Sequence, residues 1–271
     1  MGMAGDRISI METSKDSKEL LKTACTFAQS SESIDHELLL RFLRSQDFLQ
    51  RLDSESDYAA EIRLRIRRVL DELAKNQNPS ARNILVALTQ DQTFLMEPAR
   101  VDRLIQACAV IRPLPPEVIK FWDDHCQPED GFTPLTIEAI IENGSEPALT
   151  LLEQKMLDPR QMEQDIIAWM HTNILIHRND LPLLRSCERM LAGGLPEKLR
   201  LALGDVLFDY RPTEWFPDNI EIRPPDRRQA GSEALAQLRK IGEYALKNIL
   251  MKARLRKAVM DTLEEIKKIQ E

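Results

Sequence analysis

Apolar residues recur at every third or fourth position along most of this chain, the spacing that favours amphipathic α-helices. Near the N-terminus this pattern predicts a helix over residues 17–30, a second one from Ser33 and a third over 56–75. Residues 1–16 are polar and lack the periodicity, so we expect a loose arm there. Shorter helices follow, separated by turns that contain proline or glycine; they are 80–90, 97–111, 115–125, 133–143, 146–157, 159–177, 181–191 and 196–208.

Two of these helix-turn-helix segments repeat each other at a distance of 35 residues. Residues 140–149 align with residues 175–184, and Pro147 and Pro182 fall in the same place, inside the first turn of the second helix. The pairs Asn143-Gly144 and Gly193-Gly194 are typical helix stops. A repeat of this length predicts helix pairs that stack to bury a shared core.

The stretch around residues 80–210 resembles the HEAT/armadillo class of α-solenoids, most closely at residues 138–157 and 173–191. The resemblance rests on the period, the turns and the place of the prolines. It implies a helical-repeat surface that binds proteins, as a scaffold or adaptor does, with the second helices lining a shallow concave face. Two clear copies imply degenerate neighbours, because stable stacking requires three or more.

After residue 210 the proline content and the pattern of apolar residues change. Four prolines in residues 211–231 exclude a regular helix and predict a connector. Residues 232–271 then predict one long amphipathic helix, interrupted only by Gly242, whose apolar stripe must pack on its own chain or on a second copy. The expected organisation is an arm over 1–16, a helical region over 17–78, repeats over 79–210, the connector and the final helix.

Composition supports an all-α fold. Aromatic residues are only 5% of the 271 residues, and glycine is limited to 9. The net charge is −7, but residues 227–271 carry +5 and the preceding residues −12, so a basic tail follows an acidic body. Four scattered cysteines indicate free thiols, and no apolar run is long enough to cross a membrane. We therefore expect a cytoplasmic protein.

No cofactor, metal site or catalytic site is expected. Asp123, Asp124, His125 and Cys126 are adjacent, and adjacent helical residues cannot all face one ion. The sequence contains no phosphate-binding glycine loop and no nucleophile elbow. The deoxyhypusine hydroxylases, helical-repeat enzymes that bind two iron atoms, carry repeated His-Glu pairs. This chain has one such pair, His36-Glu37, outside the repeats.

Candidate partner-binding residues come from the repeat alignment. It places polar side chains on the second helices of the two clear repeats, at Glu153, Lys155, Arg185, Glu188 and Arg189. Trp215 and Phe216 in the connector either anchor a partner or cover the open end of the last repeat.

Nucleic-acid binding is the alternative function. It would use the run that contains Arg63, Arg65, Arg67 and Arg68, or the final helix through Arg254 and Arg256. The same arginines fit a solvated helix face paired with neighbouring carboxylates, or a tail that docks on the acidic body. Self-association through the final helix is a further possibility.

Overall fold

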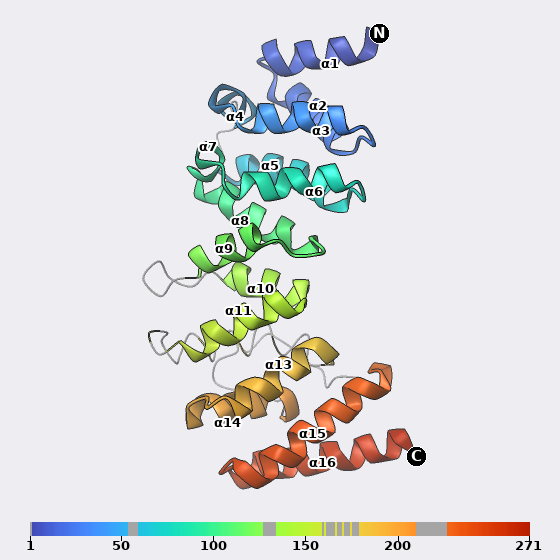
Figure 1. Ribbon diagram of the computed structural model, residues 1–271, viewed down its shortest axis with the longest axis vertical. Helices are drawn as coiled ribbons and strands as arrows, with labels where there is room; N and C mark the ends of the chain where they lie inside the picture. Colours follow the sequence, from blue (N-terminus) through green and yellow to red (C-terminus); the bar gives the residue numbers. More distant parts are fainter. Residues whose placement is uncertain are drawn as a thin grey trace. The chain divides into compact units, whose positions relative to one another are not determined.

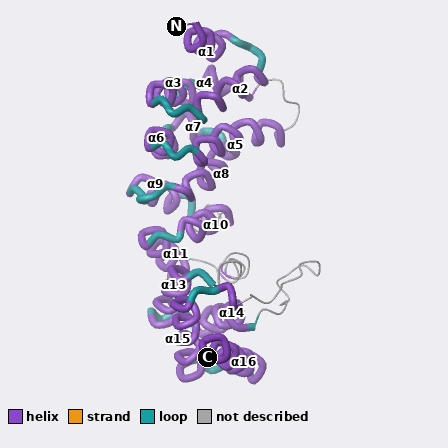
Figure 2. The backbone as a smooth tube through the Cα atoms, turned by 90° about the vertical axis from the view of Figure 1, so that its right-hand side faces the viewer, coloured by secondary structure: helices purple, strands orange, loops and turns teal. Residues whose placement is uncertain are grey.

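The computed structural model describes residues 2–53, 59–126, 134–158, 160, 166, 170, 174, 179–209 and 227–271, and leaves out the side chains of residues 2–5, 59–64 and 134. Within these ranges the regular structure is helical, without a strand (Figure 2). The all-α class is therefore confirmed. The chain divides into two compact units, Met1–His125 and Cys126–Glu271, and the division falls inside the stretch expected to be repeats.

The first unit contains consecutive helices that pack as pairs. Helix α2 (Ser17–Ala28) packs on α3 (Ser33–Leu43), and α5 (Ala59–Lys75) packs on α6 (Pro79–Leu88). The two pairs also stack on each other, since α2 contacts α5 and α3 contacts α6 (Figure 1). The next helix, α8 (Pro98–Ala107), lies against α5. Each of these helices turns its buried leucine, isoleucine and phenylalanine side chains toward its neighbours.

Smaller helices complete this unit. Helix α9 (Pro116–Asp124) matches the expected helix over 115–125, with Pro116 in its first turn. The pattern missed α4 (Gln46–Asp53) and α7 (Gln92–Leu95), whereas the 3₁₀ turn η1 (Cys108–Val110) lies inside the helix expected over 97–111. These elements are too short to establish a period of 3.6 residues by themselves.

The expected loose arm is wrong. Residues Gly2–Thr13 form helix α1, which packs on α2 and buries Met11. The Arg51 guanidinium donates to the backbone carbonyls of Met11 (3.1 Å) and Ser14 (2.8 Å), at the end of α1. A helix leaves its last carbonyls without intrahelical partners, so this distant arginine supplies what the local sequence lacks.

A buried polar cluster joins the two helix pairs of the first unit. His36 on α3 is buried, and its Nδ1 lies 2.5 Å from the hydroxyl of Ser80 on α6. The Asn76 amide, just after α5, donates to the carbonyls of Ala28 and Ser30 at the end of α2, at 2.8 Å each. Buried polar groups are tolerated when they are hydrogen-bonded in this way, and here they fix one pair against the next.

The second unit also consists of packed helices. They are α10 (Pro134–Asn143), α11 (Glu146–Leu157), α13 (Leu181–Ala192), α14 (Glu197–Phe208), the short η4 (Arg227–Gln229), α15 (Ser232–Asn248) and α16 (Ala253–Gln270). Helix α11 packs on α10 and on α13, and α13 packs on α15. Helix α16 packs on both α14 and α15 (Figure 1). Most of the expected helix over 159–177, like the connector, lies outside the described residues.

The predicted helix stops lie where the sequence places them. Gly144 follows α10 with a φ of 61°, a left-handed conformation that side chains other than glycine's adopt with strain. Gly194 follows α13 with a φ of 92°. Pro147 and Pro182 both lie in the first turns of α11 and α13.

The expectation of one uninterrupted final helix is wrong. The chain leaves the helix after Asn248, and Ile249 is extended, with a φ of −113° and a ψ of 127°. The two halves fold back on each other as α15 and α16. Their apolar positions are buried, so the apolar stripe packs on its own chain. Their buried apolar residues are Ala234, Leu235, Leu238, Ile241, Ala245, Leu255, Val259 and Ile266.

Gly242 marks a close contact instead of a break. A Cβ atom at this position would lie 3.0 Å from Leu263 Cδ2 and 3.4 Å from the Phe208 ring. Gly204 is similar, because its Cβ would lie 3.3 Å from Leu255 Cδ2. The two glycines therefore let α14, α15 and α16 approach one another closely.

Valine in place of Gly242 is expected to lower the free energy of unfolding by about 1–3 kcal/mol, because its methyl groups would overpack this contact. Urea denaturation measures the change. The matched control is Ala236→Val on the exposed side of the same helix, which reports only the cost of a β-branched residue in a helix. Equal losses in both variants would contradict the close packing.

Candidate partner-binding surface

The candidate residues on α11 and α13 form ion pairs with each other. Arg189 on α13 donates to both carboxylate oxygens of Glu153 on α11, with Nε at 3.0 and 3.1 Å and Nη2 at 2.7 Å from Oε1. Arg189 Nη2 also lies 3.1 Å from Oε1 of Glu146, and the Ser186 hydroxyl donates to Glu153. Lys155 is buried. Glu153 therefore fastens α11 to α13.

The same arrangement continues from α13 to α15. Lys240 Nζ lies 2.7 Å from Glu188 Oε1, and the Gln237 amide donates to the other oxygen of Glu188 at 2.6 Å. Arg185 lies 3.7 Å from Glu233, a looser pair between exposed side chains. We call this set of contacts across α11, α13 and α15 the ion-pair ladder. Glutamates and cations alternate along it, so its exposed side has little net charge to offer a partner.

Charged neighbours change the proton affinities within the ladder. The hydrogen bond from Lys240, with a further one from Gln237, holds the pKa of the Glu188 carboxyl below its usual range. The hydrogen bond with Glu153 raises the pKa of the Arg189 guanidinium. Both shifts favour the charged forms that make the ladder.

Glutamine in place of Glu188 is expected to destabilise the chain near neutral pH by less than about 1 kcal/mol, since Lys240 is exposed. Because the folded pKa is lowered, this contribution is present above the unfolded pKa, about 4.3, and is lost as the pH falls through the folded value. Urea midpoints of the variant and the wild type should therefore differ at pH 7 and converge near pH 3. The control is Glu197→Gln, at an exposed position on α14. Its urea midpoint should match that of the wild type at both pH values.

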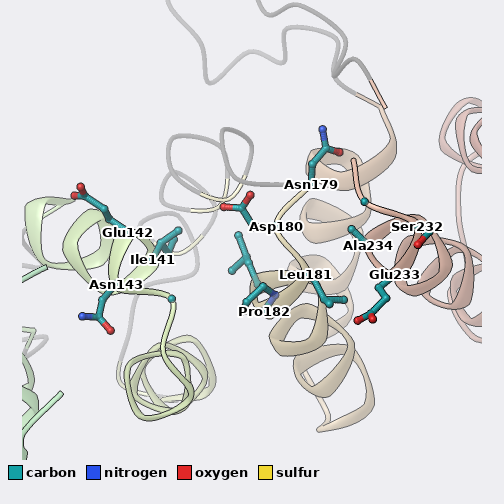
Figure 3. A pocket seen from close by; sticks show the side chains of 13 residues that line it. Ile141, Glu142, Asn143, Asn179, Asp180, Leu181, Pro182, Ser232, Glu233 and Ala234 are labelled. Carbon is teal, nitrogen blue, oxygen red and sulfur yellow. The ribbon is translucent and has the colours of Figure 1, made fainter. Parts of the chain in front are cut away.

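A hollow of about 570 Å³ lies beside the starts of α13 and α15. Its lining comes from the end of α10, the start of α13 and the start of α15, so three elements converge on it. Figure 3 shows Asp180 in the middle of this lining, with Glu142 on one side and Glu233 on the other. Asn143 and Asn179 add amide groups. We call it the helix-start hollow; its charged side chains are all acidic, and apolar side chains such as Ile141 and Leu183 share the lining.

The arginine run of the first unit does not form one exposed basic face. Arg65 is buried on α5 and donates to the backbone carbonyl of Leu52 at 2.9 Å. Arg67 pairs with Asp71 at 3.4 Å, one helical turn away. Arg68 is exposed, and the side chain of Arg63 lies outside the described part. The run is divided between the core and the surface, as expected when four arginines share one amphipathic helix.

The two C-terminal arginines also differ in environment. Arg254 Nε donates to the buried carboxylate of Asp209 at 2.5 Å, which ties α16 to the end of α14. Arg256 is exposed. A second hollow of about 560 Å³ adjoins the pair, and its lining includes Arg227, Lys257 and Glu265. Cationic and anionic side chains alternate in that lining, so it has no dominant charge.

The remaining candidates give no reactive centre in the described part. Trp215 and Phe216 lie outside the described residues. His125 Nδ1 lies 2.8 Å from the Phe121 carbonyl, and no group of three or more His, Cys, Asp and Glu side chains in the described ranges is placed to hold a metal ion. Burial raises the pKa of the Cys187 thiol to about 12, which keeps that sulfur protonated and unreactive.

Sequence reasoning missed the partners of the ladder on α15, Gln237 and Lys240. A signal for them was present, since Gly231-Ser232-Glu233 repeats Gly144-Ser145-Glu146 at the start of the equivalent helix. A third copy of the repeat that begins at Gly231 predicts that α15 lies beside α13.

Comparison with protein-family models, curated proteins and solved structures finds no match to this chain. A search of the described helices for one long and apolar enough to cross a membrane also finds none.

Proposed function

We propose that this chain is a noncatalytic scaffold or adaptor, built as a HEAT-like α-solenoid, that binds a segment of a partner protein. The observation that carries the proposal is the side-by-side packing of α11, α13 and α15, together with the hollow that the starts of α13 and α15 form with the end of α10. Stacked second helices of this kind form extended binding surfaces in solenoid proteins. The four free cysteines support a cytoplasmic location.

The helix-start hollow is the part of this surface that suits a bound segment best. Three carboxylates from three different elements, those of Glu142, Asp180 and Glu233, line this hollow, and Glu233 also pairs with Arg185 in the ion-pair ladder. Carboxylates and the amide oxygen of Asn179 can accept hydrogen bonds from the backbone N–H groups of an extended segment and from its cationic side chains. An extended chain fills such a hollow without a deep apolar pocket.

Cross-linking of the intact protein in native extracts, followed by mass spectrometry, tests the proposal. Reversing two exposed charges, Glu142→Lys with Glu233→Lys, should remove cross-links to partner proteins that form at the hollow. The control is Glu197→Lys with Glu243→Lys, which makes the same change in net charge on α14 and α15 away from the lining. Equal cross-linking by both double variants, or no cross-linked protein at all, would reject a scaffold that works through this hollow.

The nucleic-acid alternative has less support. Three of the six arginines named for it, Arg65, Arg67 and Arg254, are buried or hold contacts within the chain. Counterion release from a phosphate backbone requires exposed cations in a continuous track. A gel-shift titration at low salt checks the alternative, which predicts binding that weakens steeply with salt and with Arg256→Gln.

A further inference from the structure

The turn between α15 and α16 concentrates positive charge. Residues 247–260 contain five cations and no Asp or Glu. The five are Lys247, Lys252, Arg254, Arg256 and Lys257. Arg254 is paired with Asp209, but no ion pair joins Lys247, Arg256 or Lys257 to any residue in the described ranges. The three are exposed, and Lys257 also lines the second hollow, whose carboxylates are Asp209, Asp261 and Glu265.

Every other cation on the same two helices forms an ion pair with a neighbouring carboxylate. On α15, Arg239 pairs with Glu243 at 3.0 Å and Lys240 with Glu188 at 2.7 Å. On α16, Lys267 pairs with Glu271 at 3.8 Å and Lys268 with Glu264 at 2.8 Å. The charge imbalance is therefore confined to the turn and the first part of α16, and it is not a general property of the basic tail.

An exposed leucine lies within this positive region. Leu250 is 84% exposed, more than any other large apolar side chain in the described part of the chain. Its orientation follows from the backbone, because Ile249 is extended and buried, and successive side chains of an extended chain point in opposite directions. The side chain of Ile249 is buried in the second unit, so the side chain of Leu250 points toward solvent.

An exposed apolar side chain that lies close in the chain to several exposed cations has the composition of a protein-docking surface. In protein interfaces an apolar residue is desolvated at the centre and charged groups surround it. Contacts to a nucleic-acid backbone come from cations and polar groups and gain little from an exposed leucine. The combination of Leu250 with unpaired Arg256 and Lys257 therefore favours a protein partner with the opposite charge.

We propose that the turn formed by Lys247, Leu250, Lys252, Arg256 and Lys257, the basic turn, is a docking surface for an acidic protein segment that carries an apolar side chain to pack on Leu250. This inference rests on the proposed scaffold function and adds a second surface to it. Helix α15 begins at the helix-start hollow and ends at the basic turn, and its 17 residues span roughly 25 Å. Two surfaces of opposite charge at the two ends of one helix are what a scaffold needs to hold two different segments.

The test uses the intact protein and a random peptide library displayed on phage. Enriched peptides should include a class with net negative charge and a large apolar residue. One such synthetic peptide should bind about tenfold more weakly to Leu250→Ser and to the double variant Arg256→Gln with Lys257→Gln. Raising the salt from about 50 to 500 mM should shrink the effect of the charge variant and leave the effect of Leu250→Ser.

Matched controls separate the possible failures. Lys267→Gln with Lys268→Gln removes the same charge from the same helix and should change the affinity less than about threefold. Peptides that are enriched yet bind all variants equally would overturn the basic turn and leave the scaffold function standing. A different result would be binding of single-stranded DNA in place of any peptide, with affinity for the DNA lost in Arg256→Gln but not in Leu250→Ser. It would overturn both the basic turn as a protein-docking surface and the scaffold function, and would favour nucleic-acid binding.

Discussion

Alanine in place of Phe208 is expected to lower the free energy of unfolding by about 3–5 kcal/mol. The ring is 2% exposed at the end of α14, and it faces Gly242 of α15 at the contact that brings the C-terminal hairpin onto the rest of its unit. Removing it leaves a cavity that the neighbouring backbone cannot fill, because Gly242 has no side chain to move into the space. Urea denaturation followed by circular dichroism measures the loss.

The conservative variant Phe208→Leu is the control and should cost less, because it retains most of the apolar volume. Light scattering adds a second measurement. If the hairpin detaches in Phe208→Ala, the apolar faces of α15 and α16 become available to other copies and the mass should rise with concentration. A stability within 1 kcal/mol of the wild type at unchanged mass would show that Phe208 does not hold the hairpin, contrary to its position.

Alanine in place of Asp53 is expected to lower the free energy of unfolding by about 2–3 kcal/mol in the first unit, because a buried hydrogen bond to a charged group is lost. Arg100 Nη2 on α8 lies 2.6 Å from Asp53 Oδ2 at the end of α4, and both side chains are largely buried. Without the carboxylate the guanidinium would remain in the core with its charge uncompensated. Urea denaturation of Asp53→Ala measures this cost.

The matched variant Asp53→Ala with Arg100→Met removes both charges and should recover most of the loss. Burial raises the pKa of Asp53 in spite of the hydrogen bond from Arg100, so removing the charges from water costs more than the pair returns. This carboxyl therefore favours the folded state fully below the unfolded pKa, about 3.9, and the contribution is lost as the pH rises through the folded value. A double variant as unstable as the single one would contradict the argument.

The sequence predicted most helices because their signals are local. The period of three to four residues, a proline in the first turn and a glycine at the end all lie within one helix, as at Pro182 and Gly194. The break after Asn248 has no such signal, since Ile249, Leu250 and Met251 continue the apolar run. Helix α16, which follows the break, packs on α14, and such a contact between distant residues leaves no local pattern in the sequence. Helix α1 likewise depends on Arg51, about forty residues away.

The candidate surface was only partly accessible to sequence reasoning. Alignment of the repeats placed Glu153 and Glu188 at equivalent positions, and the structure puts Arg189 beside Glu153. A repeat of 35 residues therefore predicts which side chains become neighbours between stacked helices. It does not predict whether they pair with each other or remain open to a partner, because that choice depends on side-chain geometry across the interface. The helix-start hollow depends in the same way on three turns that are far apart in the sequence.

The left-handed turn after α10 also bears on the chemical lifetime of the protein. An asparagine followed by glycine is prone to deamidation, in which the glycine nitrogen attacks the asparagine side-chain carbon and ammonia leaves. Here the Gly144 nitrogen donates to the Ile140 carbonyl at 3.0 Å, and the buried Asn143 side chain accepts from Ser145, so the attacking and attacked groups are both held. Aspartate or isoaspartate that accumulates at position 143 during storage would thus record how often this corner of the second unit opens.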